Sequence, residues 1–176
     1  MADSKSDSII GGHFATKPLD NPLWQYACQV YSKKGVEAAL LVLQDVHGAD
    51  INLILQALWL ASEGQQWTKE CIPEDYSAWM DAQVLPLRQM RRSMKIEWVE
   101  KRGAQYEGFR QQVKKLELKA EQYALGMLFL QSNNTSAEEQ NEAELLANSL
   151  HNLAEYFTIE PDRMLNILNL INNRGG

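Results

Sequence analysis

The chain has 176 residues, of which 45% are hydrophobic and 23% charged, with a formal net charge of −6. This balance is ordinary for a globular protein, and its acidity argues against nucleic acid as the main partner, because binding phosphates needs a basic face. The only two cysteines, Cys28 and Cys71, are too few and too far apart for a disulfide framework or a zinc finger.

The first 18 residues are polar and contain Gly11, Gly12 and Pro18, so we expect a flexible N-terminal tail (1–18) ahead of a single helical domain (19–174). The start, MADSKSDSII, lacks the long apolar stretch of a signal peptide. No run approaches the ~20 apolar residues of a membrane span. We therefore expect a cytoplasmic protein.

The first helix is predicted to begin at Pro22, where a proline is tolerated in the first turn, after a cap at Asp20 or Asn21. Two more helices follow, over about 36–47 and 51–63, with Gly48 ending the first and Asp50 capping the second. Both are apolar nearly all round, which is typical of enclosed helices. We predict that this short helical hairpin forms the centre of the core.

A further helix is predicted to start at Pro73, and Pro86 should kink or break it. The most regular pattern comes next. A heptad seam extends over residues 99–130. It consists of Val99, Tyr106, Phe109, Val113, Leu116, Ala120, Tyr123, Met127 and Leu130. Most of it lies on a long helix that is predicted to run from Gly103 or Ala104 to Gln131.

Ser136 and Glu139 form a capping box before a helix that reaches Phe157, and a last helix begins near Pro161. Because the loop is short, we expect the helix ending at Gln131 and the helix ending at Phe157 to form a long antiparallel pair. The seam either packs within the chain or joins a second copy or another protein. The fold class is therefore all-α, a bundle of six to seven helices without strands.

Polar side chains gather at the turn of the hairpin: Gln44, Asp45, His47, Asp50 and Asn52. Carboxylates and an imidazole this close could bind a small ligand or a divalent metal. The alternative is structural, with Asp50 capping its helix and the others fastening the turn. This segment contains no second histidine, and its loop is far shorter than a calcium-binding loop.

A basic stretch lies at 88–102, where six cations face two carboxylates and give a net charge of +4. Its first four cations, Arg88, Arg91, Arg92 and Lys95, are candidates for binding a partner protein. Two alternatives stay open. The stretch could pair with the chain's own acidic segment, since residues 120–162 hold eight acids and no Lys or Arg, or it could bind nucleic acid.

Motifs of known catalytic sites are missing: the chain has no P-loop, G-x-G-x-x-G, G-x-S-x-G or H-E-x-x-H pattern. No catalytic residue, cofactor or metal is therefore predicted. Folding can still bring distant groups together, so an enzyme stays open. The pattern favours a non-catalytic interaction or scaffold protein, with a small-ligand or metal-binding protein that uses residues 44–52 as the alternative.

The segment LWQYACQVYSKKGVEAALLVLQDVHGADINLILQALWLA resembles a family of short proteobacterial proteins known only as a domain of unknown function. The shared pattern includes Leu23-Trp24, Gly35-Val36, Leu43-Gln44-Asp45 and Leu58-Trp59, and the resemblance covers about residues 21–130. It implies a bacterial cytosolic helical protein. It brings no activity, cofactor or site residue.

Overall fold

The structure is a computed structural model, and it describes residues 19–132 and 141–165. Within these residues the chain is helical and contains no strand, which confirms the all-α prediction. The predicted tail, the capping box at Ser136 and most of the last helix lie outside the described residues. The α-helices that lie wholly within the described residues are α1 (Pro22–Tyr31), α2 (Val36–His47), α3 (Ile51–Ser62), α4 (Tyr76–Trp79), α5 (Leu85–Ser93), α6 (Glu107–Ser132) and α7 (Glu142–Phe157).

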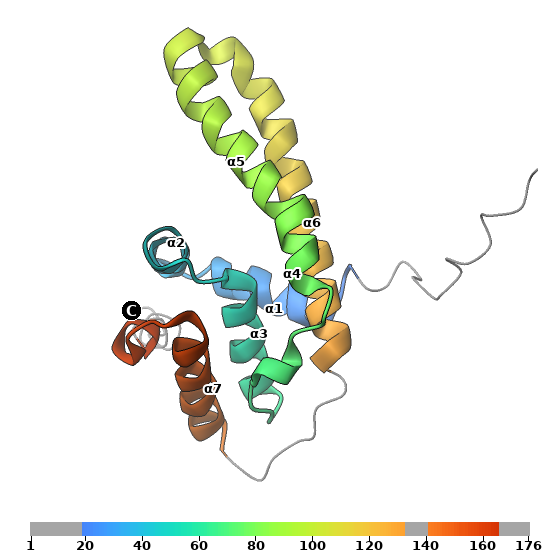
Figure 1. Ribbon diagram of the computed structural model, residues 1–176, viewed down its shortest axis with the longest axis vertical. Helices are drawn as coiled ribbons and strands as arrows, with labels where there is room; N and C mark the ends of the chain where they lie inside the picture. The colour runs from blue at the N-terminus through green and yellow to red at the C-terminus, as the bar shows by residue number, and fades with distance from the viewer. Residues whose placement is uncertain (1–18, 133–140, 166–176) are drawn as a thin grey trace, which may run out of the picture.

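The lower part of the molecule in Figure 1 comprises α1, α2, α3, α7 and the C-terminal part of α6. We call it the body, and it is built around α3. Every residue from Ile51 to Ala61 is buried, because α1, α6 and α7 all pack against this helix and α2 contacts one of its ends. At its centre Gln56 donates to the carbonyls of Cys71 and Leu128, at 3.0 and 3.2 Å, and accepts from Trp67 Nε1 at 3.0 Å. A buried amide is stable here because the groups around it satisfy its hydrogen bonds.

The prediction that both hairpin helices are central is right for α3 and wrong for α2. Only Val36, Leu40 and Leu43 of α2 are buried, whereas Val42 and Val46 are 53% and 69% exposed. The physical reason is that α2 has substantial contacts only with α1 and α3. An all-round apolar sequence does not reveal how many neighbours a helix has.

Residues 76–100 form one continuous helix, in which α4 is followed by the π-helical turn η2 (Met80–Val84), α5 and a second π-helical stretch, η3 (Met94–Glu100). Pro86 does not break it, so that part of the prediction is wrong, and the regular α-helix is instead interrupted by the π-helical turn just before the proline. The proline lies in the first turn of α5, directly after η2, where the Leu85 N–H donates to the Met80 carbonyl five residues back. The wider π turn accommodates a residue that lacks an N–H.

This continuous helix and α6 run antiparallel and project from the body (Figure 1); we call residues 85–120 the arm. At its tip the chain reverses through Gly103, whose φ of +117° suits only glycine, and the 3₁₀ turn η4 (Ala104–Tyr106). Trp98 packs edge-on against Tyr106 with ring centroids 5.2 Å apart, and the Arg102 guanidinium lies 4.5 Å above the Trp98 ring. These contacts close the tip.

The long antiparallel pair predicted from the sequence therefore exists, but the partner of α6 is the helix over 76–100 and not α7, which packs on α3. The seam is also rotated. The inward stripe of α6 runs through Val113, Glu117, Ala120, Ala124 and Leu128, while Leu116 and Tyr123 are exposed. Glu117 takes the inward place because cations on α5 face it. No helix among the described residues is long and apolar enough to cross a membrane.

Candidate functional site

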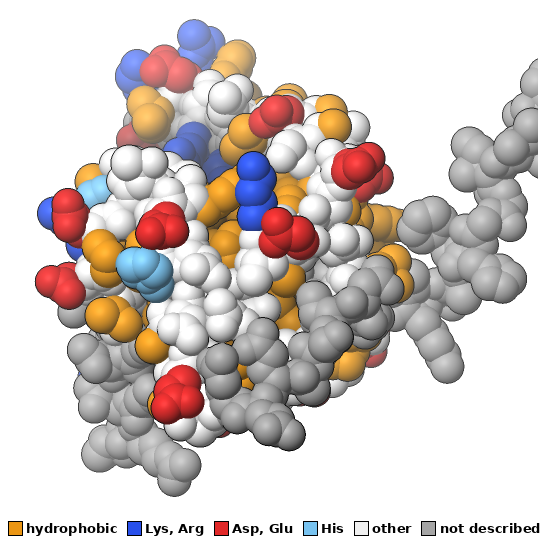
Figure 2. All heavy atoms as spheres, turned by 60° about the horizontal axis from the view of Figure 1, so that its bottom comes forward, with side chains coloured by type: hydrophobic (Ala, Val, Ile, Leu, Met, Phe, Trp, Pro, Cys, Tyr) orange, Lys and Arg blue, Asp and Glu red, His pale blue; other side chains and the backbone are white. Residues whose placement is uncertain are grey.

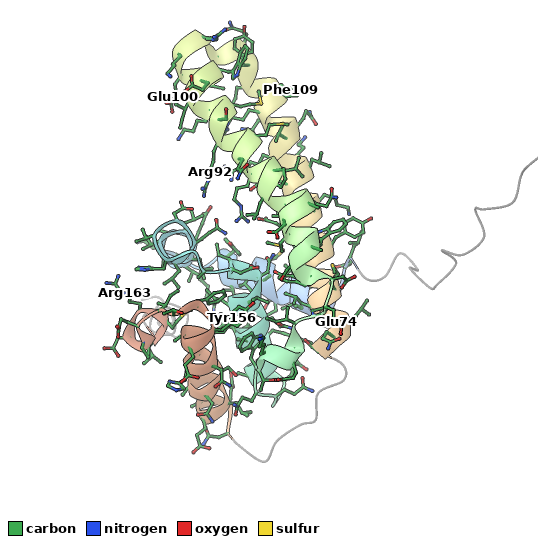
Figure 3. The ribbon with its side chains drawn as sticks, viewed as in Figure 1. Glu74, Arg92, Glu100, Phe109, Tyr156 and Arg163 are labelled. Atoms are coloured by element: carbon green, nitrogen blue, oxygen red, sulfur yellow. The ribbon has the colours of Figure 1, made fainter. Side chains whose placement is uncertain are left out.

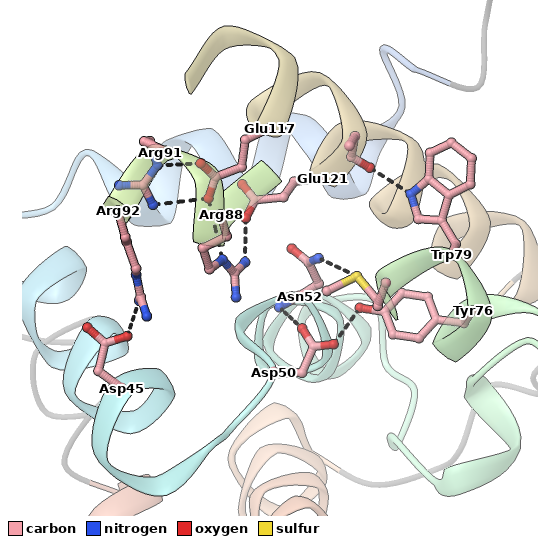
Figure 4. Close-up of polar contacts among 12 residues, drawn as sticks. Asp45, Asp50, Asn52, Tyr76, Trp79, Arg88, Arg91, Arg92, Glu117 and Glu121 are labelled. Atoms are coloured by element: carbon pink, nitrogen blue, oxygen red, sulfur yellow. Dashed lines mark hydrogen bonds and ion pairs between the residues drawn. The ribbon is translucent and has the colours of Figure 1, made fainter. Parts of the chain in front are cut away.

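The α2–α3 turn is built as its sequence predicts. Gly48 ends α2 with a φ of +69°, and Asp50 is the N-cap of α3. Asp50 Oδ1 accepts from the Asn52 N–H at 2.9 Å, and Oδ2 accepts from the Tyr76 hydroxyl at 2.8 Å. This carboxylate therefore fastens the turn to α4 as well as to its own helix (Figure 4).

Burial at this position perturbs both partners. Desolvation raises the pKa of Asp50 above its usual value, and the hydrogen bonds from Tyr76 and the Asn52 backbone oppose that rise only in part. Burial and the neighbouring Asp50 charge raise the pKa of Tyr76 well above its usual value. The phenol therefore stays protonated and donates a hydrogen bond to the carboxylate.

Next to this pair, two arginines of α5 bind two glutamates of α6. Arg88 Nη2 lies 2.6 Å from Glu121 Oε1 and Arg88 Nε 3.4 Å from Glu117 Oε1. Arg91 binds both oxygens of Glu117, with its Nη2 at 3.0 Å. Burial lowers the pKa of Arg88, but the two glutamates outweigh it and the net shift is upward. The arm is thus joined by a partly buried network of charges.

A third arginine joins the arm to the body. Arg92 donates to Asp45 of α2, and both side chains are about half exposed (Figure 4). Figure 3 places Arg92 on the side of the arm that faces α2, and Phe109 on the other side. Of the four cations predicted to bind a partner, Arg88 and Arg91 are held inside the arm, and only Arg92 and Lys95 extend into solvent.

A cavity of about 400 Å³ lies between the α2–α3 turn, the α4–α5 helix and the end of α7. Three of the five residues predicted for a ligand site line it, namely Gln44, Asp45 and Asp50. The other two do not. His47 Nε2 contacts Arg163 Nη1 at 3.0 Å beside a different cavity, and the buried Asn52 points its amide at Met80 Sδ, 3.9 Å away.

The geometry does not support a metal site at the α2–α3 turn. Across residues 19–132 and 141–165, no group of three or more His, Cys, Asp or Glu side chains is close enough to hold a metal ion. Asp50 accepts hydrogen bonds from Asn52 and Tyr76, and His47 lines a different cavity, so the turn does not bring these two side chains together. The turn instead forms one wall of a cavity that is large enough for a small organic molecule.

The sequence did not predict most of the residues that line the cavity opposite the α2–α3 turn. Tyr76, Asp81, Tyr156 and Phe157 line the cavity, but they come from distant segments and no local pattern joins them to the turn. The glutamates that hold the arm were easier to find. Glu117 lies four residues after Val113 and three before Ala120, so it is a charge in an apolar stripe, and such a residue needs a partner.

The fold and the site define a class: an all-helical protein with a packed body, a projecting two-helix arm and a polar cavity where the two meet. Residues 22–128 match the family described as "Protein of unknown function (DUF2390)", and the chain belongs to this family. The match confirms the resemblance seen in the sequence, and it includes the whole arm but not α7. No curated protein and no solved structure matches the chain.

Proposed function

We propose that this protein is a non-catalytic interaction protein, and that the outer face of α6 binds an acidic amphipathic helix of a partner protein. The observation that carries the proposal is an exposed apolar row beside two lysines, Lys115 and Lys119, that form no ion pair with any described residue. We also propose that the protein works in the bacterial cytosol, as the resemblance of its first helices implies.

The apolar row consists of Phe109, Leu116, Tyr123 and Leu130, which are 62%, 57%, 44% and 49% exposed. They are spaced by seven residues and therefore lie along one side of α6. Soluble proteins seldom leave such a stripe open unless it binds something. The heptad seam of the sequence is thus divided: one half packs inside the arm and the other half faces outward.

The charges around the row are mostly positive. Glu117 and Glu121 face inward and are bound by the arginines of α5. Lys115 makes no ion pair with any described residue, and Lys119 donates to the neutral Gln122 at 3.0 Å and lies 5.8 Å from the centroid of the Tyr123 ring. An acidic helix with its own apolar stripe would complement this face in both charge and hydrophobicity.

The arm itself also favours a partner. No residue of α5 or η3 is buried, and on α6 the arm buries only Val113, Glu117 and Ala120. Two helices with so little shared core gain stability when a third one covers them.

A second copy of the chain fits this face less well. A symmetric contact centred on Leu116 would bring Lys115 and Lys119 of both copies together, with no outward carboxylate of α6 between them. Like charges across an interface oppose association. The body in turn shows scattered acidic side chains on the face seen in Figure 2.

The test is site-specific crosslinking in the cells that make the protein. The photoreactive residue p-benzoylphenylalanine replaces Leu116 on the row or, as a control, Ile96 on the other helix of the arm, whose exposed fraction of 50% is close to the 57% of Leu116. We expect the Leu116 probe to capture one protein, and peptide mapping to place the crosslink on an acidic helix. The proposal fails if both probes capture the same proteins, if the product is a dimer of this chain, or if no product forms.

A matched pair of variants then tests the charges. In Lys115→Glu/Lys119→Glu the crosslink from position 116 should decrease at least tenfold, because the acidic helix would meet acids. In Lys33→Glu/Lys34→Glu, where two exposed lysines of the body are reversed, it should be unchanged. An equal loss in both variants would show that overall charge, and not this face, governs binding.

A further inference from the structure

We propose that the cavity at the junction of arm and body binds a small organic cation, consisting of an ammonium group on a short apolar or aromatic skeleton. This inference is independent of the function proposed for α6, because the cavity and the apolar row involve different residues.

Two carboxylates of the cavity lining, Asp50 and Asp81, form no ion pair with any described residue. The charge of Arg88 is matched by Glu117 and Glu121, and that of Arg92 by Asp45. Asp50 accepts hydrogen bonds from neutral donors, the Asn52 N–H and the Tyr76 hydroxyl, and the charge of Arg88, which forms no ion pair with it, also acts to lower its pKa. Asp81, also in the lining, makes no hydrogen bond or ion pair with any described residue.

The lining of the cavity holds three carboxylates, Asp45, Asp50 and Asp81, and two arginines, Arg88 and Arg92, so its own charge balance is −1. Glu117, Glu121 and Arg91 do not line the cavity but bind Arg88 or each other, and they bring the balance of the whole charge network to −2. A bound anion would have to displace a glutamate from Arg88 or Asp45 from Arg92, and would then face Asp50 and Asp81. A cation meets these two carboxylates directly and breaks no existing pair.

The carboxyl ends of two helices also favour a positively charged ligand. Two helices end beside the cavity, α2 at Gln44, Asp45 and Gly48, and α7 at Tyr156 and Phe157. The carboxyl end of a helix carries partial negative charge and attracts cations. Two helices also begin beside the cavity: α3, whose N-terminus is capped by Asp50, and α4, whose first residue, Tyr76, donates its hydroxyl hydrogen bond to Asp50.

The walls suit an ammonium ion that carries an apolar skeleton. Tyr156 and Phe157 line one side and pack edge-on against each other with centroids 5.1 Å apart, and Leu53 and Met80 line another. Aromatic faces attract organic cations, and aliphatic side chains accommodate the skeleton. The volume of about 400 Å³ is within the range of sites for small molecules.

The test is isothermal titration of the full chain with 2-phenylethylammonium and, in parallel, with 3-phenylpropionate, an anion of nearly the same shape. We expect the cation to bind with a dissociation constant below about 1 mM, and the anion to bind at least tenfold more weakly. Equal binding of both probes, tighter binding of the anion, or no binding of the cation would overturn the proposal.

Three variants locate the cation. Asp81→Asn removes an exposed carboxylate of the lining, and Asp50→Asn keeps an oxygen that can still cap α3. Each should weaken the binding of 2-phenylethylammonium about fivefold or more. Asp75→Asn removes an equal charge from an exposed residue that does not line the cavity, and should change binding less than twofold. If all three variants behave alike, the cation binds the acidic surface in general and the site does not exist.

Discussion

The body and the arm are made of the same kind of helix but are held together by different forces. In the body, α3 buries every residue from Ile51 to Ala61 among three other helices. In the arm, α5 buries none, and the two helices are joined by Arg88 and Arg91 bound to Glu117 and Glu121. The body gains its stability from apolar burial, whereas the arm depends on charges and can expose apolar surface to a partner.

The sharpest contrast comes from making one substitution in both regions. Leu60→Ala removes a side chain that is fully buried in α3, and should lower the free energy of unfolding by about 2–5 kcal/mol. Leu116→Ala removes a side chain that is 57% exposed on α6, and should change that free energy by less than about 0.5 kcal/mol. Urea titrations followed by circular dichroism measure both. Similar losses would mean that the arm is packed as tightly as the body.

The arm should instead be sensitive to its charges. Glu117→Gln leaves the Arg91 guanidinium and one bond of Arg88 without their carboxylate, and should destabilise the arm by about 1–3 kcal/mol, because these groups are only partly buried. Hydrogen exchange should show faster exchange over residues 85–120 and unchanged protection in α3. Glu97→Gln, which removes an exposed partner of Lys101, serves as the control and should leave both regions unchanged.

Where arm and body meet, stability should depend on pH through Asp50. Burial raises its pKa in the folded chain above the usual value of 3.8. Between these two values the folded form holds a proton that the unfolded form has lost. Stability from this group is therefore largest at low pH and declines as the pH rises through the raised pKa.

Asp50→Asn should remove this part of the decline, which urea titrations between pH 3.5 and 7 would measure. Glu121, whose pKa burial also raises, contributes a decline of the same sign that the variant keeps. An identical pH profile in the variant and the natural chain would show that Asp50 ionises as freely in the fold as in the unfolded chain.

Local signals in the sequence predicted the elements well. The cap at Asn21 with Pro22 behind it starts α1, and Gly48 and Asp50 set the end of α2 and the start of α3 within a residue of the prediction. These features act over a few residues, so a short stretch of sequence contains them in full.

What failed depends on distant neighbours. The seam of α6 allowed two adjacent registers, and the one observed is selected by arginines 26 to 33 residues away that bind Glu117 and Glu121. The same holds for the cavity. Its turn was visible in the sequence, but Tyr156 and Phe157 reach it from the end of α7 only once the body is packed.

The smallest effect concerns the ion pair between Arg92 and Asp45, which links the arm to α2. Arg92 and Asp45 are each about half exposed, and water screens such a pair, so each alanine variant should shift stability by less than about 1 kcal/mol. A double-mutant cycle of Arg92→Ala and Asp45→Ala, measured by thermal unfolding, should give a coupling energy of about 0.2–1 kcal/mol that decreases in high salt. A larger coupling would mean that this contact fixes the angle of the arm. A small one leaves the shielded pairs within the arm as its main support, because charge pairs strengthen as they lose contact with water.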